Sequence, residues 1–150
     1  MHITPRIMTL DAISLRVGDA AEVEACLAER ISEFNSAATG CFDAESFSAT
    51  QRDESGVIRA GITGYTWGGC SYVSYLWVEE HERGDGLGAA LLLTAERHAR
   101  GKGCVVMFLS THSFQAPAFY ERMGYVQRAV VHDHPVGHSN VYLEKRLEAP

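Results

Sequence analysis

The chain lacks the features that mark several large classes of protein. Its apolar runs, such as residues 89–93 and 104–109, are far shorter than the roughly 20 residues that cross a bilayer. It has no excess of basic residues: the net charge is −6, whereas a nucleic-acid-binding surface needs positive charge to neutralise phosphates. The Gly-Lys-Ser/Thr segment of a nucleotide-binding P-loop is also absent. We therefore expect neither a membrane nor a nucleic acid among its partners.

Cysteines are few, and their spacing does not suggest pairs. No two of them form a C-x-x-C motif; they are Cys26, Cys41, Cys70 and Cys104. The N-terminus has no basic stretch followed by a long apolar core, which a secretory signal would need. We therefore interpret the cysteines as reduced and structural, and we predict a cytoplasmic protein.

The residues that are present are typical of one mixed α/β domain. The 150 residues, 46% of them apolar, suffice for one core and contain no internal repeat, so we expect a single domain over 1–150. Alternating apolar residues predict seven strands, over 7–17, 47–52, 57–67, 71–78, 104–109, 125–131 and 140–146. Helical spacing predicts helices over 20–34, 87–100 and 116–123, and the small, polar residues 35–43 suggest a loop.

The most informative segment is the glycine-rich stretch RGDGLG, which lies directly before the second predicted helix. The start of a helix has unpaired N–H groups and the positive end of the helix dipole. Glycine lets the backbone approach a ligand closely, and Arg83 adds a fixed positive charge with two parallel donors. Together these features favour a site for a phosphate group.

Three interpretations of this loop compete. The first is a tight turn without a ligand, which three alternating glycines and an arginine fit poorly. The second is a dinucleotide fingerprint, since Gly84, Gly86 and Ala89 satisfy G-x-G-x-x-A. However, three strands precede the loop, and the strand that follows it, 104–109, carries no acidic residue for a ribose. The third is a site for the pyrophosphate of coenzyme A.

Two segments carry a resemblance that favours the third interpretation. LWVEEHERGDGLGAALL resembles the acyl-CoA-binding motif R/Q-x-x-G-x-G/A of the GNAT superfamily of N-acyltransferases, with Arg83, Gly86 and Gly88 at the motif positions. SFQAPAFYERMGY resembles the second motif of that family, N-x-x-A-x-x-x-Y-E-x-x-G-F, with matches at Ala116, Tyr120, Glu121, Gly124 and Tyr125. The order of strands and helices also fits over nearly the whole chain.

The resemblance implies a fold, a cosubstrate and a set of site residues. The fold is a mostly antiparallel twisted sheet of about seven strands with flanking helices and one splayed strand pair, where acetyl-CoA binds. Its pantetheine arm would pair with the backbone of Leu76, Trp77 and Val78. Its pyrophosphate would lie on the loop of Arg83, Gly84, Asp85, Gly86, Leu87, Gly88 and Ala89. Tyr120 would contact coenzyme A and protonate the departing sulfur, because a phenol can give its proton to a thiolate within hydrogen-bond reach.

Two residues depart from the family pattern. Ser113 stands where the family has an asparagine that contacts coenzyme A, although a hydroxyl can still donate a hydrogen bond. Phe108 stands where some members carry a glutamate base. The general base is therefore open, and the candidates are Glu79, which we favour, Glu80, Glu33, His112 or a chain of waters.

The resemblance also indicates which segments would bind the acceptor: EFNSAATGCFD and VVHDHPVGHSN. From these we predict contacts by Glu33, Asn35, Asp43 and His138. The histidines of the second segment invite a metal site, but scattered histidines in a hairpin loop without a cysteine partner are more often surface residues, so we expect no metal.

The predicted function is transfer of an acetyl group from acetyl-CoA to the primary amine of a small molecule, such as an aminoglycoside or a polyamine. The mild negative charge suits a cationic acceptor. Two alternatives stay open: acetylation of a protein or peptide amine, and a non-catalytic acyl-CoA-binding sensor. A homodimer is a further expectation from the resemblance.

Overall fold

The computed structural model describes residues 13, 15–18 and 20–148. These residues form two compact units, one that ends at Gly40 and one that begins at Cys41, so a single domain over 1–150 stays a prediction. None of the four cysteines, all of which lie in the described part, forms a disulfide. No helix in this part of the chain is long and apolar enough to cross a bilayer.

The first unit contains one helix, α1 (Ala21–Thr39). It continues beyond the predicted end at residue 34, so the expectation of a loop from residue 35 is wrong for 35–39. Thr39 Oγ1 donates to the carbonyl of Asn35 within the helix, and Gly40 ends the helix because its φ of 73° is left-handed. The predicted strand over 7–17 lies mostly outside the described residues, and residues 15–17 are not in a strand.

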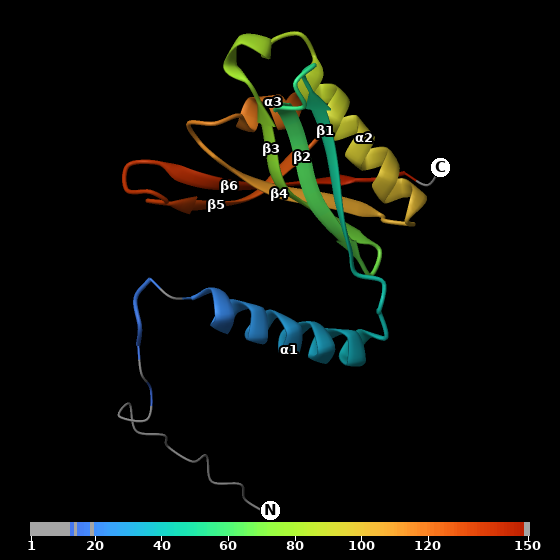
Figure 1. Cartoon of the computed structure of the whole chain (residues 1–150), viewed down its shortest axis with the longest axis vertical. Coiled ribbons are helices and arrows are strands. Elements are labelled where there is room, and N and C mark those ends of the chain that lie inside the picture. The colour runs from blue at the N-terminus through green and yellow to red at the C-terminus, as the bar shows by residue number, and fades with distance from the viewer. Residues whose placement is uncertain (1–12, 14, 19, 149–150) are drawn as a thin grey trace, which may run out of the picture. The chain divides into compact units, whose positions relative to one another are not determined.

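The second unit is a sheet of six strands, β1 (Glu45–Arg52), β2 (Ile58–Trp67), β3 (Cys70–Val78), β4 (Val106–His112), β5 (Val126–His132) and β6 (Ser139–Arg146). Their order in the sheet is β1-β2-β3-β4-β6-β5, and only β3 and β4 are parallel. The sheet twists, so that β5 and β6 run across the direction of β1 and β2 (Figure 1). The prediction of a mixed α/β fold with a mostly antiparallel sheet is confirmed, with six strands in the described residues.

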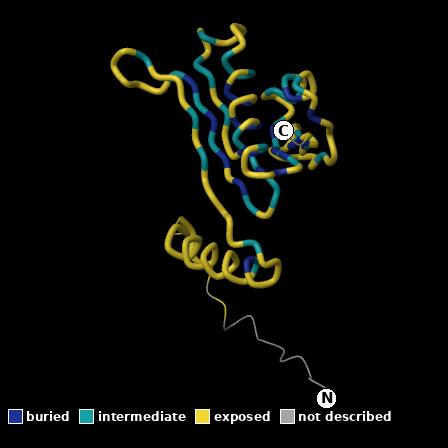
Figure 2. The backbone as a smooth tube through the Cα atoms, turned by 90° about the vertical axis from the view of Figure 1, so that its right-hand side faces the viewer, coloured by how far each residue is buried: buried dark blue, intermediate teal, exposed yellow. Residues whose placement is uncertain are grey.

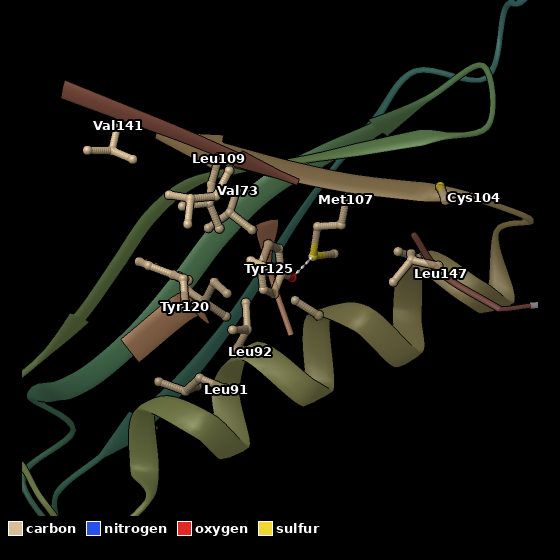
Figure 3. Close-up of a cluster of buried hydrophobic side chains, with 14 of the residues drawn as sticks. Val73, Leu91, Leu92, Cys104, Met107, Leu109, Tyr120, Tyr125, Val141 and Leu147 are labelled. Carbon is tan, nitrogen blue, oxygen red and sulfur yellow. Dashed lines mark hydrogen bonds between the residues drawn. The ribbon is translucent and has the colours of Figure 1, made fainter. Parts of the chain in front are cut away.

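Two helices lie on one face of this sheet. The longer one, α2 (Leu87–Gly101), contacts β1, β2 and β3, and the shorter one is α3 (Pro117–Arg122). A short 3-10 helix, η2 (Glu80–Glu82), lies between β3 and the glycine loop. Buried residues alternate along the strands and line the inner side of α2 (Figure 2). The core packs Leu92 of α2 and Tyr120 of α3 against Met107, Leu109 and Leu143 of the sheet (Figure 3).

A β-bulge in β3 determines which side chains of that strand face the helices. Tyr75 pairs with Thr63 and Val73 pairs with Gly64, so Ser74 is an extra residue without a partner. One extra residue reverses the alternation of a strand. Before the bulge Ser71 and Val73 are buried, and after it Leu76 and Val78 pack against the core. The bulge therefore turns Tyr75 and Trp77 to the face opposite α2 and α3, where they are 77% and 58% exposed.

The buried carboxylate of Glu96 links α2 to β6 and to Tyr125, which follows α3. Glu96 of α2 is fully buried, and Lys145 Nζ of β6 lies 2.9 Å from each of its oxygens. Arg100 Nη2 lies 3.2 Å from Oε2, and the hydroxyl of Tyr125 lies 3.2 Å from Oε1 and 3.0 Å from Met107 Sδ (Figure 3). Burial and the charge of Glu96 raise the pKa of Tyr125 far above its usual range, so its phenol stays neutral.

The bulge makes Gly64 irreplaceable. A Cβ at this position would lie 2.1 Å from the carbonyl oxygen of Tyr72 and 2.6 Å from the ring of Phe47. We expect Gly64→Ala to lower the free energy of unfolding by about 3 kcal/mol, as overpacking against backbone does. Gly61→Ala is the control on the same strand, because its Cβ would find contacts of 3.4 Å or longer. Urea unfolding of both variants, followed by tryptophan fluorescence, tests this; equal stability would contradict the bulge geometry.

The carboxylate network predicts unequal effects at two neighbouring residues of β6. Lys145→Met keeps the length of the side chain and leaves Glu96 buried without its main counter-charge, which we expect to cost about 3–5 kcal/mol of unfolding free energy. Arg146→Met is the control, because the Arg146 side chain is 71% exposed and reaches Glu144 only at 3.9 Å. Its cost should stay within about 0.5 kcal/mol. Similar unfolding midpoints in urea would show that the network contributes little.

Candidate functional site

The main groove of the second unit opens where β3 and β4 separate. The two strands pair at only three positions, which end at Tyr72 and Phe108. Beyond them the strands diverge, and a groove of about 920 Å³ lies between them. Residues 73–78 of β3 line it, with the glycine loop, residues 109–111 of β4, residues 114–116 and α3. The predicted splayed strand pair is therefore present, and it leaves the facing backbone of 76–78 without a partner on β4.

The glycine loop at one end of this groove has the geometry of an anion site. Gly84 and Gly86 have left-handed φ values of 93° and 84°, and Gly86 directly precedes α2. The first amide of the helix with a backbone partner is that of Ala90, which donates to Gly86. The amides of Leu87, Gly88 and Ala89 thus donate to no described residue, and all three residues line the groove.

Arg83 is held against the end of β3. Its Nε donates to the carbonyl of Val78 at 2.9 Å, and its guanidinium carbon lies 4.6 Å from the centroid of the Trp77 ring. These contacts occupy Val78 O and leave the terminal guanidinium N–H groups for a ligand. Arg122 of α3 is the second positively charged residue that lines the groove, and Glu82 is the negatively charged one. Asp85 is exposed on the loop and does not line the groove.

Tyr120 lies at the groove with a hydroxyl that has no partner among the described residues. The residue is 7% exposed, and its ring meets Phe119 edge-on at 5.0 Å and Tyr125 at 5.9 Å. Burial raises the pKa of Tyr120 to about 12. The phenol is therefore protonated at any physiological pH, and it can donate to an acceptor that enters the groove.

Ser113 and its neighbours differ from the sequence-based expectation. The Ser113 hydroxyl accepts from the amide of Ser139 at 3.1 Å, and its own amide donates to Ser139 O, so its hydrogen bonds serve the start of β6. Ser113 is not among the residues that line the groove, whereas the next three residues are. Gln115 in particular accepts at Oε1 from the amide of His112 at 2.9 Å. The position of Gln115 in the sequence, between a predicted strand and the helix of the second motif, could have indicated that it lines the groove.

The candidate bases lie in different surroundings. The amide of Glu79 donates to the carbonyl of Arg59 at 2.9 Å, so Glu79 continues the pairing of β3 with β2 and does not line the groove. Glu80 is exposed in η2. His112 ends β4, which extends beyond the predicted end at residue 109 because it stays paired with β6 as far as Asn140.

Within the second unit, the predicted acceptor-binding residues His138 and Asp43 lie in different places. His138 lies in the β5–β6 loop, with its ring edge-on to Phe114 of the groove at 5.0 Å. Asp43 accepts a hydrogen bond from the amide of Gly68 at the β2–β3 turn. It lines a separate cavity of about 430 Å³ together with Lys102, which directly follows the C-terminal end of α2. The glycine loop precedes the N-terminal end of the same helix, about 20 Å away along its axis. Glu33 and Asn35 lie on α1 in the first unit.

The structure also shows groove residues that the sequence did not reveal. Backbone divergence brings them together, and only Ala116 among them is a motif position. They are Val73, Ser74, Tyr75, Glu82, Leu109, Ser110, Thr111, Phe114, Gln115, Ala116, Phe119, Arg122 and Met123. No group of three His, Cys, Asp or Glu residues in the described ranges is arranged as a metal site.

Comparisons with known proteins point to one family. Residues 19–125 match the model of the acetyltransferase (GNAT) family. The blasticidin-S acetyltransferase of Streptomyces morookaense is 39% identical over 95 residues, which are 63% of this chain and 70% of that protein. The acetyltransferase Atu2258 of Agrobacterium fabrum is 32% identical over 127 residues, which are 85% of this chain and 93% of that protein.

The structural comparison agrees with this and supports the predicted fold. The crystal structure of an acetyltransferase from Bacillus cereus is 35% identical in sequence, with a TM-score of 0.75. The match covers 91% of this chain and 99% of that one. The likeness thus extends over the splayed strands and both helices that form the groove.

The loop geometry predicts that coenzyme A affinity depends on Gly86. Alanine at a left-handed φ costs about 1–2 kcal/mol, so Gly86→Ala should shift the start of α2 and weaken coenzyme A binding about tenfold. Gly101→Ala is the control, because Gly101 belongs to the same helix, has no left-handed φ and has no atom within 4 Å of an added Cβ. Isothermal titration with coenzyme A measures both; unchanged affinity in Gly86→Ala would exclude the loop from the site.

Proposed function

The chain belongs to the GNAT family of acetyltransferases and is an acetyl-CoA-dependent N-acetyltransferase. We propose that it acetylates the primary amine of a small molecule, with Tyr120 as the general acid. One observation carries the proposal: the groove between the diverging strands is lined both by unpaired amides at a helix start and by a buried, unpartnered phenol. The first suits the pyrophosphate of acetyl-CoA and the second suits its sulfur.

The groove residues have distinct roles in holding acetyl-CoA. The amides of Leu87, Gly88 and Ala89 and the guanidinium of Arg83 bind the pyrophosphate, and Arg122 adds positive charge on the α3 side. The backbone groups of 76–78 that face β4 have no partner there, and they pair with the amides of the pantetheine arm, as they would with a further strand. Val78 O is the exception, because Arg83 already occupies it.

Tyr120 acts on the departing sulfur. When the carbon–sulfur bond breaks, the sulfur becomes a thiolate, whose ordinary pKa is about 8.5. The pKa of about 12 for Tyr120 makes the phenol a weaker acid than it is in water. The same buried surroundings disfavour the thiolate anion, which raises its own affinity for a proton. A phenol that is always protonated and has no competing acceptor is therefore a suitable donor.

Two observations support a small cationic acceptor. The relative from Streptomyces morookaense is named for an antibiotic, blasticidin S. The net charge of −6 favours the approach of a protonated amine over that of an anion. Blasticidin S, an aminoglycoside and a polyamine therefore form the first panel of acceptors, with short peptides as the test of the protein-amine alternative.

Replacement of Tyr120 separates catalysis from binding. Tyr120→Phe should lower kcat about 100-fold and leave coenzyme A affinity unchanged, because the hydroxyl has no partner before the reaction. Tyr65→Phe is the control, since Tyr65 lies where β2 and β3 are regularly paired, away from the groove. The activity of the wild type should not decrease with rising pH through loss of the Tyr120 proton below about pH 11, because the pKa of Tyr120 is about 12.

The readout is mass-spectrometric detection of acetylated product from each amine of the panel. A mass gain on the small amines alone would establish the acceptor class, and a gain on peptides alone would favour the protein-amine alternative. Coenzyme A binding without any product would favour the sensor alternative. Full activity of Tyr120→Phe would exclude Tyr120 as the acid.

A further inference from the structure

We propose that His112 is the general base of the transfer, and that its Nε2 takes the proton from the acceptor's ammonium group. The assignment rests on the proposed function, because it requires an amine acceptor. It replaces Glu79, whose amide is bound to β2. Neither His112 nor Glu79 is among the residues that line the groove, but the His112 ring stacks on Phe114, which lines it.

The side chain of His112 lies on the face of the sheet opposite α2 and α3. Met107, Leu109 and Thr111 of β4 are buried on the side of α2 and α3, so Phe108, Ser110 and His112 point to the opposite face. The bulge in β3 turns Tyr75 and Trp77 to that same face. No helix of the second unit covers this face, and His112 stands two residues beyond Ser110, which lines the groove.

The hydrogen bond of the His112 ring determines its tautomer. Nδ1 lies 3.0 Å from the carbonyl oxygen of His134. A carbonyl only accepts, so Nδ1 carries a proton, and in the neutral ring Nε2 therefore carries the lone pair. Nε2 makes no hydrogen bond to any described residue. When Nε2 takes a proton, the bond at Nδ1 is unchanged, so the ring needs no rearrangement to act as a base.

The ring is held in place before the reaction. It stacks on Phe114, a groove residue, with centroids 5.2 Å apart and planes within 5° of each other. The His134 ring meets it edge-on at 5.2 Å. The two hydrogen bonds between Ser113 and Ser139 and the bond from the His112 amide to Gln115 fix the backbone on either side. Such preorganisation is what a base needs for efficient proton transfer.

Titratable neighbours of the ring come from one element, the β5–β6 loop. His134 meets the ring directly, and His138 meets Phe114, on which the ring stacks. Asp133 lies at the start of the same loop, where its carboxylate accepts from the amide of Gly137 at 3.2 Å. The residues that β6 and the β4–α3 connection place beside His112 are uncharged, namely Asn140, Phe114 and Gln115. Glu82, the carboxylate of the groove, lies beside the glycine loop instead.

The protons of the proposed reaction balance. The ammonium gives one proton to His112, directly or through one water, and His112 releases it to solvent. The amine nitrogen then forms a bond to the thioester carbon, and the carbon–sulfur bond breaks. The nitrogen releases a second proton to solvent as the amide forms. Tyr120, which gave its own proton to the sulfur, takes a proton back from solvent. The products are the acetamide, coenzyme A as the thiol and one released proton.

The test compares kcat/KM between pH 6.5 and about 10 for wild type, His112→Gln and His132→Gln, with the best amine of the panel and acetyl-CoA. We expect His112→Gln to lose about 100-fold near pH 7, within the range of general-base catalysis. The deficit should shrink as the pH approaches the amine's own pKa, because a neutral amine needs no base. Added imidazole should partly restore the activity of His112→Ala. His132→Gln is the control: this histidine of β5 is exposed, and the hydrogen bond of its ring is to Ser139 Oγ at 3.2 Å.

The other outcomes overturn the proposal. A deficit that is the same at every pH would show that His112 only supports the structure, and no deficit would show that it has no role. A pH-dependent deficit in Glu79→Gln, with normal His112→Gln, would assign the base to Glu79. If wild type acetylates no amine at any pH, the proposed function itself fails, and that result is distinct because it does not depend on a variant.

Discussion

The loss of pairing between β3 and β4 after Tyr72 is the constraint on which the groove depends. In a closed sheet the backbone of 76–78 would be bound to β4 and no ligand could enter. The divergence coincides with the extra residue Ser74, which also reverses the alternation of β3. Gly64 opposite the bulge leaves the space that this distortion requires. The bulge thus lies where the sheet opens, and it turns Trp77 outward and Leu76 against the core.

The buried network of Glu96 links the open sheet to the helices that complete the groove. Lys145 and Arg100 compensate its charge, and Tyr125 connects it to the end of α3. The amide of Tyr125 donates to the carbonyl of Tyr120, and the two rings touch edge-on. The position of the proposed acid therefore depends on a charge in the middle of α2, about three turns from the glycine loop at the start of that helix.

Local patterns predicted most of the elements because their determinants lie close together in the sequence. All six strands of the second unit and both of its α-helices lie within about three residues of the predicted ranges. The glycine loop and the motif tyrosine likewise lie at the groove where the family resemblance placed them. The extended α1 shows the limit of such patterns: small polar residues suggest a loop, although alanines also favour a helix.

The sequence by itself determined the order of elements, the loop that suits a phosphate and the family, because hydrophobic periodicity and glycine conformation act over a few residues. Only the tertiary structure decided which polar side chains reach the groove. Ser113 is bound to Ser139, 26 residues later, and Asp43 lies at the far end of α2. His112 owes its tautomer to the carbonyl of His134, which a hairpin brings beside β4. Such roles depend on contacts between distant segments, and these exist only once the sheet has formed.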